Sequence, residues 1–155
     1  MNILLVIDIQ QKYLKSYKPT LVDRVNARIE EAIKRDIPVV YVRNIGISGR
    51  EASFEFADDL KIKSDCIFSK RFPSAFTNEE FGEFLEKMNV DIINVVGVDG
   101  RCCVYRTVMN AIKRGYKVRL MMDAIEAHND KFYFKELVAM EKAGAEVNSN
   151  LEELV

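Results

Sequence analysis

Cys103 is the residue with the clearest potential for chemistry. It follows a turn that contains Gly97 and Gly100, and it begins a pattern of helical period. A thiol at a helix N-terminus lies near unpaired backbone N–H groups and the positive end of the helix dipole, both of which favour the thiolate. The same N–H groups could receive the charge that develops on a carbonyl oxygen. The position therefore indicates either a nucleophile or a small buried core residue, which free cysteines often are.

Asp8 and Lys70 could assist such a thiol. Asp8 ends the apolar run Ile3–Ile7, so its carboxylate would be partly removed from water. Loss of water raises the pKa of a carboxyl group and would let Asp8 act as a base, although an acidic turn residue at a strand end is the alternative. Lys70 alone is either a catalytic cation or a solvated surface lysine.

The elements that must position these residues alternate along the chain. Six short apolar runs are continuous, which is typical of strands covered on both faces. These runs lie at residues 3–7, 38–42, 66–68, 92–96, 118–122 and 145–147, and helical patterns lie at 21–33, 77–88, 104–113 and 137–143. Thr77 and Glu80 match a capping box, and Gly144 a helix stop. The alternation predicts a parallel sheet with helices on both faces.

The expected strand ends locate a candidate site. In an open parallel sheet, ligands bind at the carboxyl ends of the strands, where the strand order reverses. Asp8, Lys70 and Cys103 all follow expected strands. The irregular stretch from Asn44 to about Asp59 has the glycine content of a mobile loop, and we expect it to be a lid or a pocket wall.

The three residues, taken with their neighbours, resemble the isochorismatase-like cysteine hydrolases, a family that includes nicotinamidases and N-carbamoylsarcosine amidases. The resemblance spans nearly the whole chain. It rests on Leu5-Val6-Ile7-Asp8-Ile9-Gln10, Lys70-Arg71-Phe72-Pro73-Ser74-Ala75-Phe76, Gly97-Val98-Asp99-Gly100-Arg101-Cys102-Cys103-Val104 and Gly115-Tyr116-Lys117-Val118. It implies one Rossmann-like α/β domain over residues 1–155, in three α/β/α layers, with a six-stranded parallel sheet in the strand order 3-2-1-4-5-6.

The resemblance also implies roles. Cys103 would attack the carbonyl carbon of a small-molecule amide or ureido group and form a thioester. Asp8 would accept the thiol proton and pass it to the leaving amine, while Lys70 would hold both groups electrostatically. A cis peptide is implied at Val98–Asp99, which would turn the N–H of Asp99, together with that of Cys103, towards the oxyanion.

The implied pocket walls are aromatic. Tyr13 lies where the family often has an aromatic residue against the substrate, and Phe72 and Phe76 flank Lys70. An aromatic cluster is more often part of a hydrophobic core than of a binding site.

The chain departs from the family pattern in three places. Nicotinamidases carry an aspartate and histidines for a metal after the second strand, whereas residues 42–47 contain no histidine and His128 is the only one in the chain. We therefore expect no metal and no other cofactor. Gly100 replaces a frequent threonine and would loosen its turn. Asp99 would place a carboxylate near the oxyanion, which could disfavour anionic substrates.

Composition narrows the class of protein. The 155 residues suit one domain, and 23 basic against 24 acidic side chains lack the basic excess of a nucleic-acid-binding protein. Three cysteines form no disulfide framework and fit a reducing, cytoplasmic location. The apolar N-terminal run is too short for a secretory signal or a membrane span.

The run Phe132-Tyr133-Phe134 cannot be buried on one helix face. Because family members are usually oligomers, we expect a homo-oligomer, either a dimer or a tetramer.

Two alternatives stay open. The departures at Asp99 and Gly100 would suit a catalytically silent binding or scaffolding protein with this fold. The adjacent thiols of Cys102 and Cys103 would suit redox chemistry.

Overall fold

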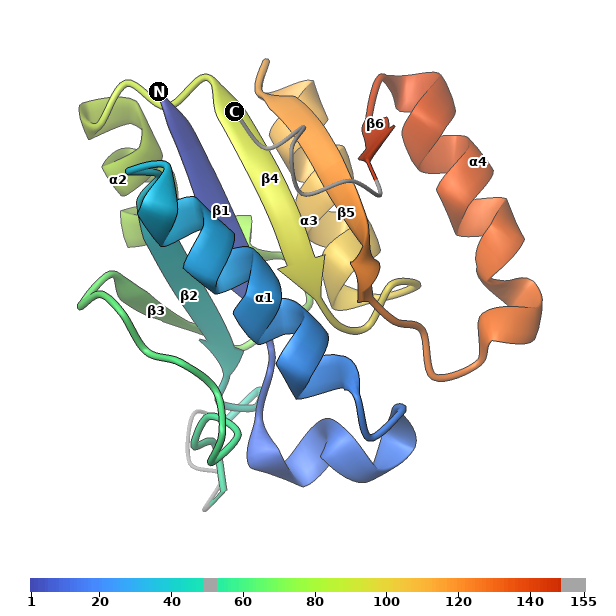
Figure 1. The fold of residues 1–155 in the computed structure, drawn as a ribbon. Coiled ribbons are helices and arrows are strands. Elements are labelled where there is room, and N and C mark those ends of the chain that lie inside the picture. Colours follow the sequence, from blue (N-terminus) through green and yellow to red (C-terminus); the bar gives the residue numbers. More distant parts are fainter. Residues whose placement is uncertain (49–52, 149–155) are drawn as a thin grey trace.

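A six-stranded parallel sheet forms the centre of the computed structural model, which describes residues 1–48 and 53–148 (Figure 1). The strands are β1 (Asn2–Ile7), β2 (Val39–Asn44), β3 (Ile67–Lys70), β4 (Ile92–Gly97), β5 (Lys117–Ile125) and β6 (Glu146–Asn148). The helices are α1 (Leu21–Lys34), α2 (Glu79–Lys87), α3 (Cys103–Lys113) and α4 (Tyr133–Ala143), with 3-10 helices η1 (Gln11–Ser16), η2 (Ala75–Thr77) and η3 (Asp130–Phe132). The order β3-β2-β1-β4-β5-β6 confirms the predicted three-layer topology.

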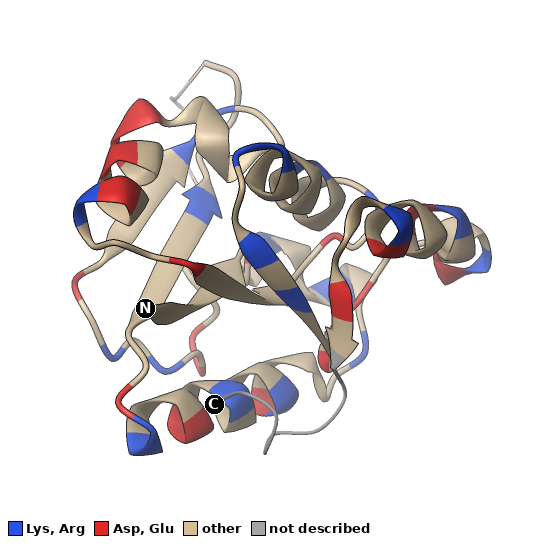
Figure 2. Cartoon of the chain, turned by 90° about the horizontal axis from the view of Figure 1, so that it is seen from above, with Lys and Arg blue, Asp and Glu red and all other residues tan. Residues whose placement is uncertain are grey.

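Helices cover both faces of the sheet, which is why the strands read as continuous apolar runs. Ile3, Leu5 and Ile7 of β1 belong to a core shared with α2, α3 and α4, whereas Leu4 and Val6 belong to a core shared with α1. Figure 2 shows this arrangement from above, with α1 alone on one side of the sheet. Burial on both faces of β1 fixes its register and therefore the position of the residue that follows it.

The strand order reverses between β1 and β4, and a glycine makes the two strands meet closely there. Gly97 ends β4 with a φ of 124°, and a Cβ at this position would lie 2.1 Å from the carbonyl oxygen of Ile7. The next residue, Val98, donates its N–H to the same oxygen at 3.0 Å. Only glycine permits this approach, which brings the segment before α3 beside the end of β1.

Several element boundaries differ from the sequence predictions. Strands β3 and β5 extend to Lys70 and Ile125, beyond the predicted ends at 68 and 122, and the starts of two helices also differ. The capping residue of α2 is Asn78, whose side chain accepts the N–H of Glu80 at 2.9 Å. The predicted capping box at Thr77 is therefore wrong by one residue, because the Thr77 hydroxyl instead donates to the carbonyl oxygen of Ser74 at 2.7 Å within η2. Helix α4 begins at Tyr133, earlier than predicted, and ends as expected at Gly144, with a φ of 119°.

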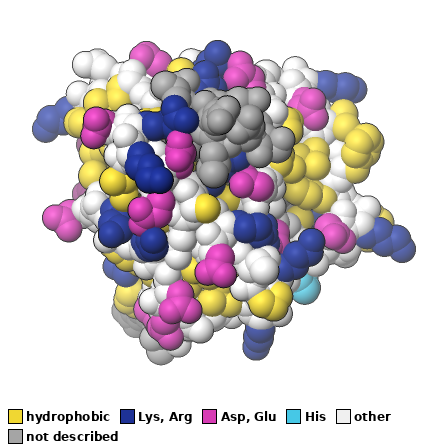
Figure 3. Space-filling model, viewed as in Figure 1, with side chains coloured by type: hydrophobic (Ala, Val, Ile, Leu, Met, Phe, Trp, Pro, Cys, Tyr) yellow, Lys and Arg dark blue, Asp and Glu magenta, His cyan; other side chains and the backbone are white. Residues whose placement is uncertain are grey.

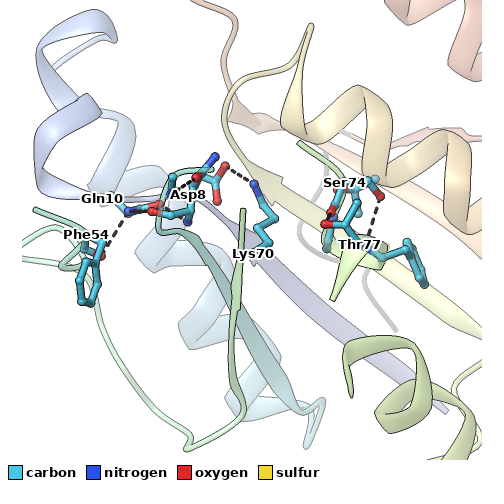
Figure 4. A network of polar contacts seen from close by, with 11 residues as sticks. Asp8, Gln10, Phe54, Lys70, Ser74 and Thr77 are labelled. Atoms are coloured by element: carbon cyan, nitrogen blue, oxygen red, sulfur yellow. Dashed lines mark hydrogen bonds and ion pairs between the residues drawn. The ribbon is translucent and has the colours of Figure 1, made fainter. Parts of the chain in front are cut away.

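A buried glutamine shortly after β1, Gln10, forms hydrogen bonds with the segment that follows β2. Gln10 accepts the N–H of Asn44 at 2.7 Å and donates to the carbonyl oxygens of Asn44 and Phe54 at 2.9 and 3.2 Å (Figure 4). Residues 49–52 of the expected lid, including Gly49, lie outside the described residues. On either side of them, these bonds fix the chain against the start of η1.

Charged side chains of both signs are intermixed on the surface. On the face shown in Figure 3, basic and acidic groups alternate, so this face offers no continuous basic surface for nucleic acid. Among the residues that the structure describes, no helix has the length and apolar character needed to cross a membrane.

Candidate active site

Asp8 and Lys70 form a buried ion pair at the carboxyl ends of the strands. Asp8 follows β1 in the left-handed region, with a φ of 53°, and Lys70 is the last residue of β3. Lys70 Nζ lies 2.9 Å from Asp8 Oδ2, and the two side chains are 1% and 3% exposed. Because β2 lies between β1 and β3, the lysine side chain reaches across the end of β2 to the carboxylate (Figure 4).

Burial sets the protonation behaviour of this pair. Removal from water raises the pKa of Asp8, and the ammonium of Lys70 offsets only part of that rise. Burial alone would lower the pKa of Lys70, but the charge of Asp8, together with that of Cys103 when its thiol is ionised, raises it. Asp8 Oδ1 is buried and has no hydrogen-bond partner among the described residues. The pair therefore combines a permanent cation with a carboxylate that has one acceptor atom unused and an increased affinity for a proton.

Cys103 is the first residue of α3 and lies within electrostatic reach of the pair. Burial raises the pKa of its thiol, the charge of Asp8 raises it further, and Lys70 opposes both. Burial and the charge of Asp8 therefore oppose the thiolate that the helix N-terminus was expected to favour. Both effects favour the neutral thiol at Cys103 over its thiolate.

The loop before α3 leaves two backbone donors unpaired. The Val98–Asp99 peptide is cis, as the resemblance implies. The carbonyl oxygen of Asp99 accepts the N–H groups of Cys102 and Val104, each at 3.0 Å, so the loop folds back on itself. The N–H groups of Asp99 and Cys103 donate to no other residue that the structure describes. Unpaired donors of this kind are able to stabilise an oxyanion.

A small cavity of about 150 Å³ joins these groups. The predicted residues Asp8, Tyr13, Val98, Asp99 and Cys103 all line it. Tyr17 and Cys102, which the sequence analysis did not place here, complete the lining. Lys70 does not line the cavity and contacts it only through its ion pair with Asp8. The structure therefore brings together the residues of the predicted centre and one aromatic wall, Tyr13.

The carboxylate of Asp99 is held by three donors. Its Oδ2 accepts the Tyr17 hydroxyl at 2.9 Å and the backbone N–H of His128 at 2.6 Å. Its Oδ1 accepts the N–H of Arg101 at 2.9 Å. Burial, reinforced by the charge of Asp99, raises the pKa of Tyr17, which stays a neutral donor. Asp99 therefore links η1 to the segment after β5, and this positioning contact was missed from the sequence.

Gly100 does not loosen its turn. A Cβ at this position would lie 2.6 Å from Cζ of Tyr133, the first residue of α4. The tyrosine ring, which is buried, takes the space that a larger residue would need. The glycine departs from the family pattern because α4 packs closely on the loop before α3.

The other aromatic candidates lie away from the cavity. Phe76 is buried in the core, with its ring centroid 5.0 Å from that of Phe81, and it does not line the cavity at Cys103. Phe72 is half exposed and lines a neighbouring hollow, which shares Cys102 with this cavity. Of the aromatic run, Tyr133 is buried, whereas Phe132 and Phe134 are 54% and 75% exposed.

The described residues do not fit a metal site. Over residues 1–48 and 53–148, no group of three or more His, Cys, Asp or Glu side chains could hold an ion. The ring of His128 instead contacts the carbonyl oxygen of Ser16, with Nδ1 at 3.2 Å. A hollow of about 700 Å³ lies at the opposite end of the sheet, near Ile92 and Lys117 at the strand starts, away from the ion pair.

The fold and the site define a Rossmann-like α/β protein with a polar site where the strand order reverses. A model of the isochorismatase domain matches residues 2–150, and the chain belongs to this family of hydrolases, which includes amidases.

The relatives support the same assignment. The chain is 25% identical over 151 residues to isochorismatase domain-containing protein 2 of Xenopus laevis, covering 93% of this chain and 69% of the relative. Two solved structures share the fold. Pyrazinamidase of Pyrococcus horikoshii, solved in complex with zinc, has a TM-score of 0.81 and 19% identity, covering 96% of this chain and 99% of the other. N-carbamoylsarcosine amidase from Thermoplasma acidophilum has a TM-score of 0.79 and 23% identity, covering 95% of each chain.

Proposed function

We propose that this protein is a cysteine hydrolase that cleaves a C–N bond of a small amide or ureido compound. The observation that carries the proposal is the buried Lys70–Asp8 pair, which ends at the cavity that Cys103 lines. A carboxylate, a cation and a thiol at a helix start are the groups that acyl transfer requires. The family and its amidase members support the same reaction class.

The first half-reaction forms a thioester. Asp8 Oδ1 takes the thiol proton as the sulfur of Cys103 attacks the carbonyl carbon, and the carbonyl π electrons move to oxygen. The N–H groups of Asp99 and Cys103 stabilise this oxyanion. The tetrahedral intermediate collapses, the C–N bond breaks, and the carboxyl group of Asp8 gives its proton to the departing nitrogen. An amine or ammonia leaves, and the acyl group stays on sulfur.

The second half-reaction restores the enzyme. Asp8 takes a proton from water as the water oxygen attacks the thioester carbonyl, and the same N–H groups stabilise the second oxyanion. The C–S bond breaks, Asp8 returns the proton to sulfur, and the acid product leaves. Lys70 stays protonated throughout and limits the cost of the buried carboxylate. A raised pKa suits Asp8 for this work, since a more basic carboxylate removes a thiol proton more readily.

An amine-release screen over small neutral and acidic amides and ureido compounds tests the proposal. We expect at least one compound to release ammonia or an amine with wild-type protein and none to do so with Cys103→Ala. Hydrolysis that survives Cys103→Ala would overturn the cysteine mechanism, and a screen with no turnover would favour the binding or scaffolding alternative.

The redox alternative has its own test. Cys102 is exposed, Cys103 is half-buried, and all three cysteines are free. In the hydrolase mechanism only the sulfur of Cys103 forms a covalent bond, so Cys102→Ser retains turnover. Loss of turnover in Cys102→Ser as complete as in Cys103→Ser would support the thiol pair instead.

We also propose that the chain self-associates, as a dimer or tetramer, and works in the cytoplasm on a small molecule rather than on nucleic acid or a membrane. Exposed aromatic side chains at Phe132 and Phe134 support self-association, and the free thiols support a reducing compartment. Gel filtration of a Phe132→Ala, Phe134→Ala double variant should show a later elution volume, and an unchanged volume would contradict this interface.

A further inference from the structure

A second hollow adjoins the cavity at Cys103. It measures about 440 Å³, and its lining includes Phe72 and Ser74 from the segment after β3 together with Arg106 and Asn110 from α3. Cys102 lines both this hollow and the cavity of about 150 Å³. The smaller space holds little more than a reacting group, and the hollow that shares Cys102 with it can receive the rest of a substrate.

The larger hollow carries positive charge without a carboxylate in its lining. Arg101 is partly neutralised, because its Nε lies 3.4 Å from Glu136 and its guanidinium lies over the ring of Phe132. The side chain of Arg106 makes no ion pair or hydrogen bond with any residue in the described part of the chain. Arg106 therefore supplies an uncompensated guanidinium, the group best suited to bind a carboxylate through two parallel hydrogen bonds.

A fixed amide stands beside this arginine. Asn110 is four residues after Arg106, so both side chains lie on the same face of α3. The Ser74 hydroxyl accepts the N–H of Phe76 at 3.2 Å and donates to Asn110 Oδ1 at 3.1 Å. This orientation leaves the Nδ2 hydrogens of Asn110 available as further donors to an anion.

The small cavity, by contrast, is unfavourable for the carboxylate of a substrate. Its lining includes the carboxylates of Asp8 and Asp99, and Lys70 is already paired with Asp8. An acidic substrate would therefore enter in one orientation, with its neutral amide at Cys103 and its carboxylate in the hollow of Arg106.

We propose that Arg106 and Asn110 form a carboxylate-binding subsite, and that the substrate is a small acidic amide whose carboxylate occupies this hollow. The proposal rests on the hydrolase function above and specifies its substrate class. It accounts for a site whose reacting cavity is small and whose neighbouring hollow is larger and positively charged.

A series of monoamides tests the subsite. Malonamate, succinamate and glutaramate vary the separation of amide and carboxylate, and butyramide is a neutral counterpart. We expect Arg106→Gln to raise KM at least about tenfold for the best acidic amide and to leave butyramide within about twofold. Lys113→Gln removes the same charge from the same helix outside the hollow and should change neither substrate by more than about twofold.

Binding to an inactive variant separates this proposal from the proposed function. Calorimetry should show the best acidic amide binding to Cys103→Ala and binding at least about tenfold more weakly when Arg106→Gln is added. Such binding without turnover by wild-type protein would refute the hydrolase function and support the subsite. If wild-type protein hydrolyses acidic amides and Arg106→Gln leaves their KM unchanged, the subsite would be overturned and the hydrolase function supported. Failure of Cys103→Ala to bind any acidic amide would also overturn the subsite. So would a shift in the gel-filtration volume of Arg106→Gln, because it would assign Arg106 to a contact between subunits.

Discussion

Two ion pairs with a buried cation connect a strand to another element, and they differ in what lies beside them. Asp8 and Lys70 are both almost fully buried, and one carboxylate oxygen of Asp8 has no partner among the described residues. Arg28 is fully buried, but its partner Asp123 is 37% exposed to water. A cavity with a thiol adjoins the first pair, whereas the second is part of a wider charge network.

The second pair ties α1 to β5. Arg28 donates from Nε and Nη2 to Asp123 Oδ1 at 2.9 and 2.7 Å. One turn earlier on α1, Arg24 donates to the carbonyl oxygen of Asp123 at 2.7 Å and pairs with Glu126. Two arginines thus face two carboxylates, and the charges balance within the network. In each pair one buried atom has no hydrogen-bond partner among the described residues, but it is a carboxylate oxygen at the cavity that Cys103 lines in the first pair and a guanidinium nitrogen, Nη1 of Arg28, in the second. Only the first of these atoms can accept a thiol proton.

The largest expected effect is that of Asp8→Asn on catalysis. The amide cannot accept the thiol proton, so kcat/KM should fall about 10²- to 10⁴-fold on the best substrate of the amine-release screen. Ammonia release under identical conditions measures the change. Activity within tenfold of wild type would show that Asp8 is not the base.

Lys70→Met should destabilise the protein in a pH-dependent way. Without the ammonium, the largest of the effects that offset burial is lost, so the pKa of Asp8 rises further. The folded variant therefore binds a proton more tightly than the unfolded chain, whose aspartate has a pKa of about 3.9. Stability is then highest at low pH and is lost as pH rises through the folded pKa.

Urea unfolding of Lys70→Met should thus show a loss of about 3–5 kcal/mol near pH 8, most of it recovered near pH 5. The double variant Asp8→Asn, Lys70→Met removes both charges and should regain most of the lost stability at both pH values. A pH-independent loss in the single variant would contradict this account of the pair.

Asp123→Asn tests whether the Arg28–Asp123 pair contributes to stability but not to catalysis. It leaves the guanidinium of Arg28 buried without its charged partner, which should cost about 2–3 kcal/mol after allowance for the partial exposure of Asp123. Chemical denaturation measures the loss. The kcat of the folded variant should stay within about threefold of wild type, since this pair faces no thiol. A kcat reduced as strongly as in Asp8→Asn would remove the distinction between the pairs.

The smallest effect concerns the reactivity of the resting thiol. In a Cys66→Ser, Cys102→Ser background, alkylation of Cys103 by iodoacetamide should still accelerate above pH of about 8.5, the ordinary thiol pKa. Asp8→Asn removes a charge that raises the pKa of the thiol and should move the profile to lower pH. A plateau below about pH 7 would instead indicate a resting thiolate.

The architecture could be predicted from the sequence because strands buried on both faces appear there as continuous apolar runs. Continuous apolar runs such as Ile3–Ile7 predict covered parallel strands, and the residues that follow such strands must meet at one edge of the sheet. Asp8, Lys70 and Cys103 lie at such positions, but position alone left each of them open to a structural role. The resemblance to the isochorismatase-like hydrolases joined the three into one predicted site.

Other features of the site correspond to no pattern in the sequence. The contact of Tyr17 with Asp99 joins residues 82 positions apart, and neither belongs to a periodic pattern that would pair them. Likewise, the space taken by Tyr133 beside Gly100 follows from the packing of α4, which no local motif specifies. The pKa of Cys103 depends on its burial, whereas the sequence displays only its place at a helix start.

The central claim is that the sulfur of Cys103 becomes acylated during turnover. Acid quenching of wild-type protein with a substrate from the screen, followed by mass spectrometry of its peptides, tests this directly. We predict that the peptide containing Cys102 and Cys103 gains the mass of the acyl group, that fragmentation places the group on Cys103, and that Cys103→Ala shows no adduct. Turnover with the acyl group on Cys102, or an adduct that persists in Cys103→Ala, would contradict the account.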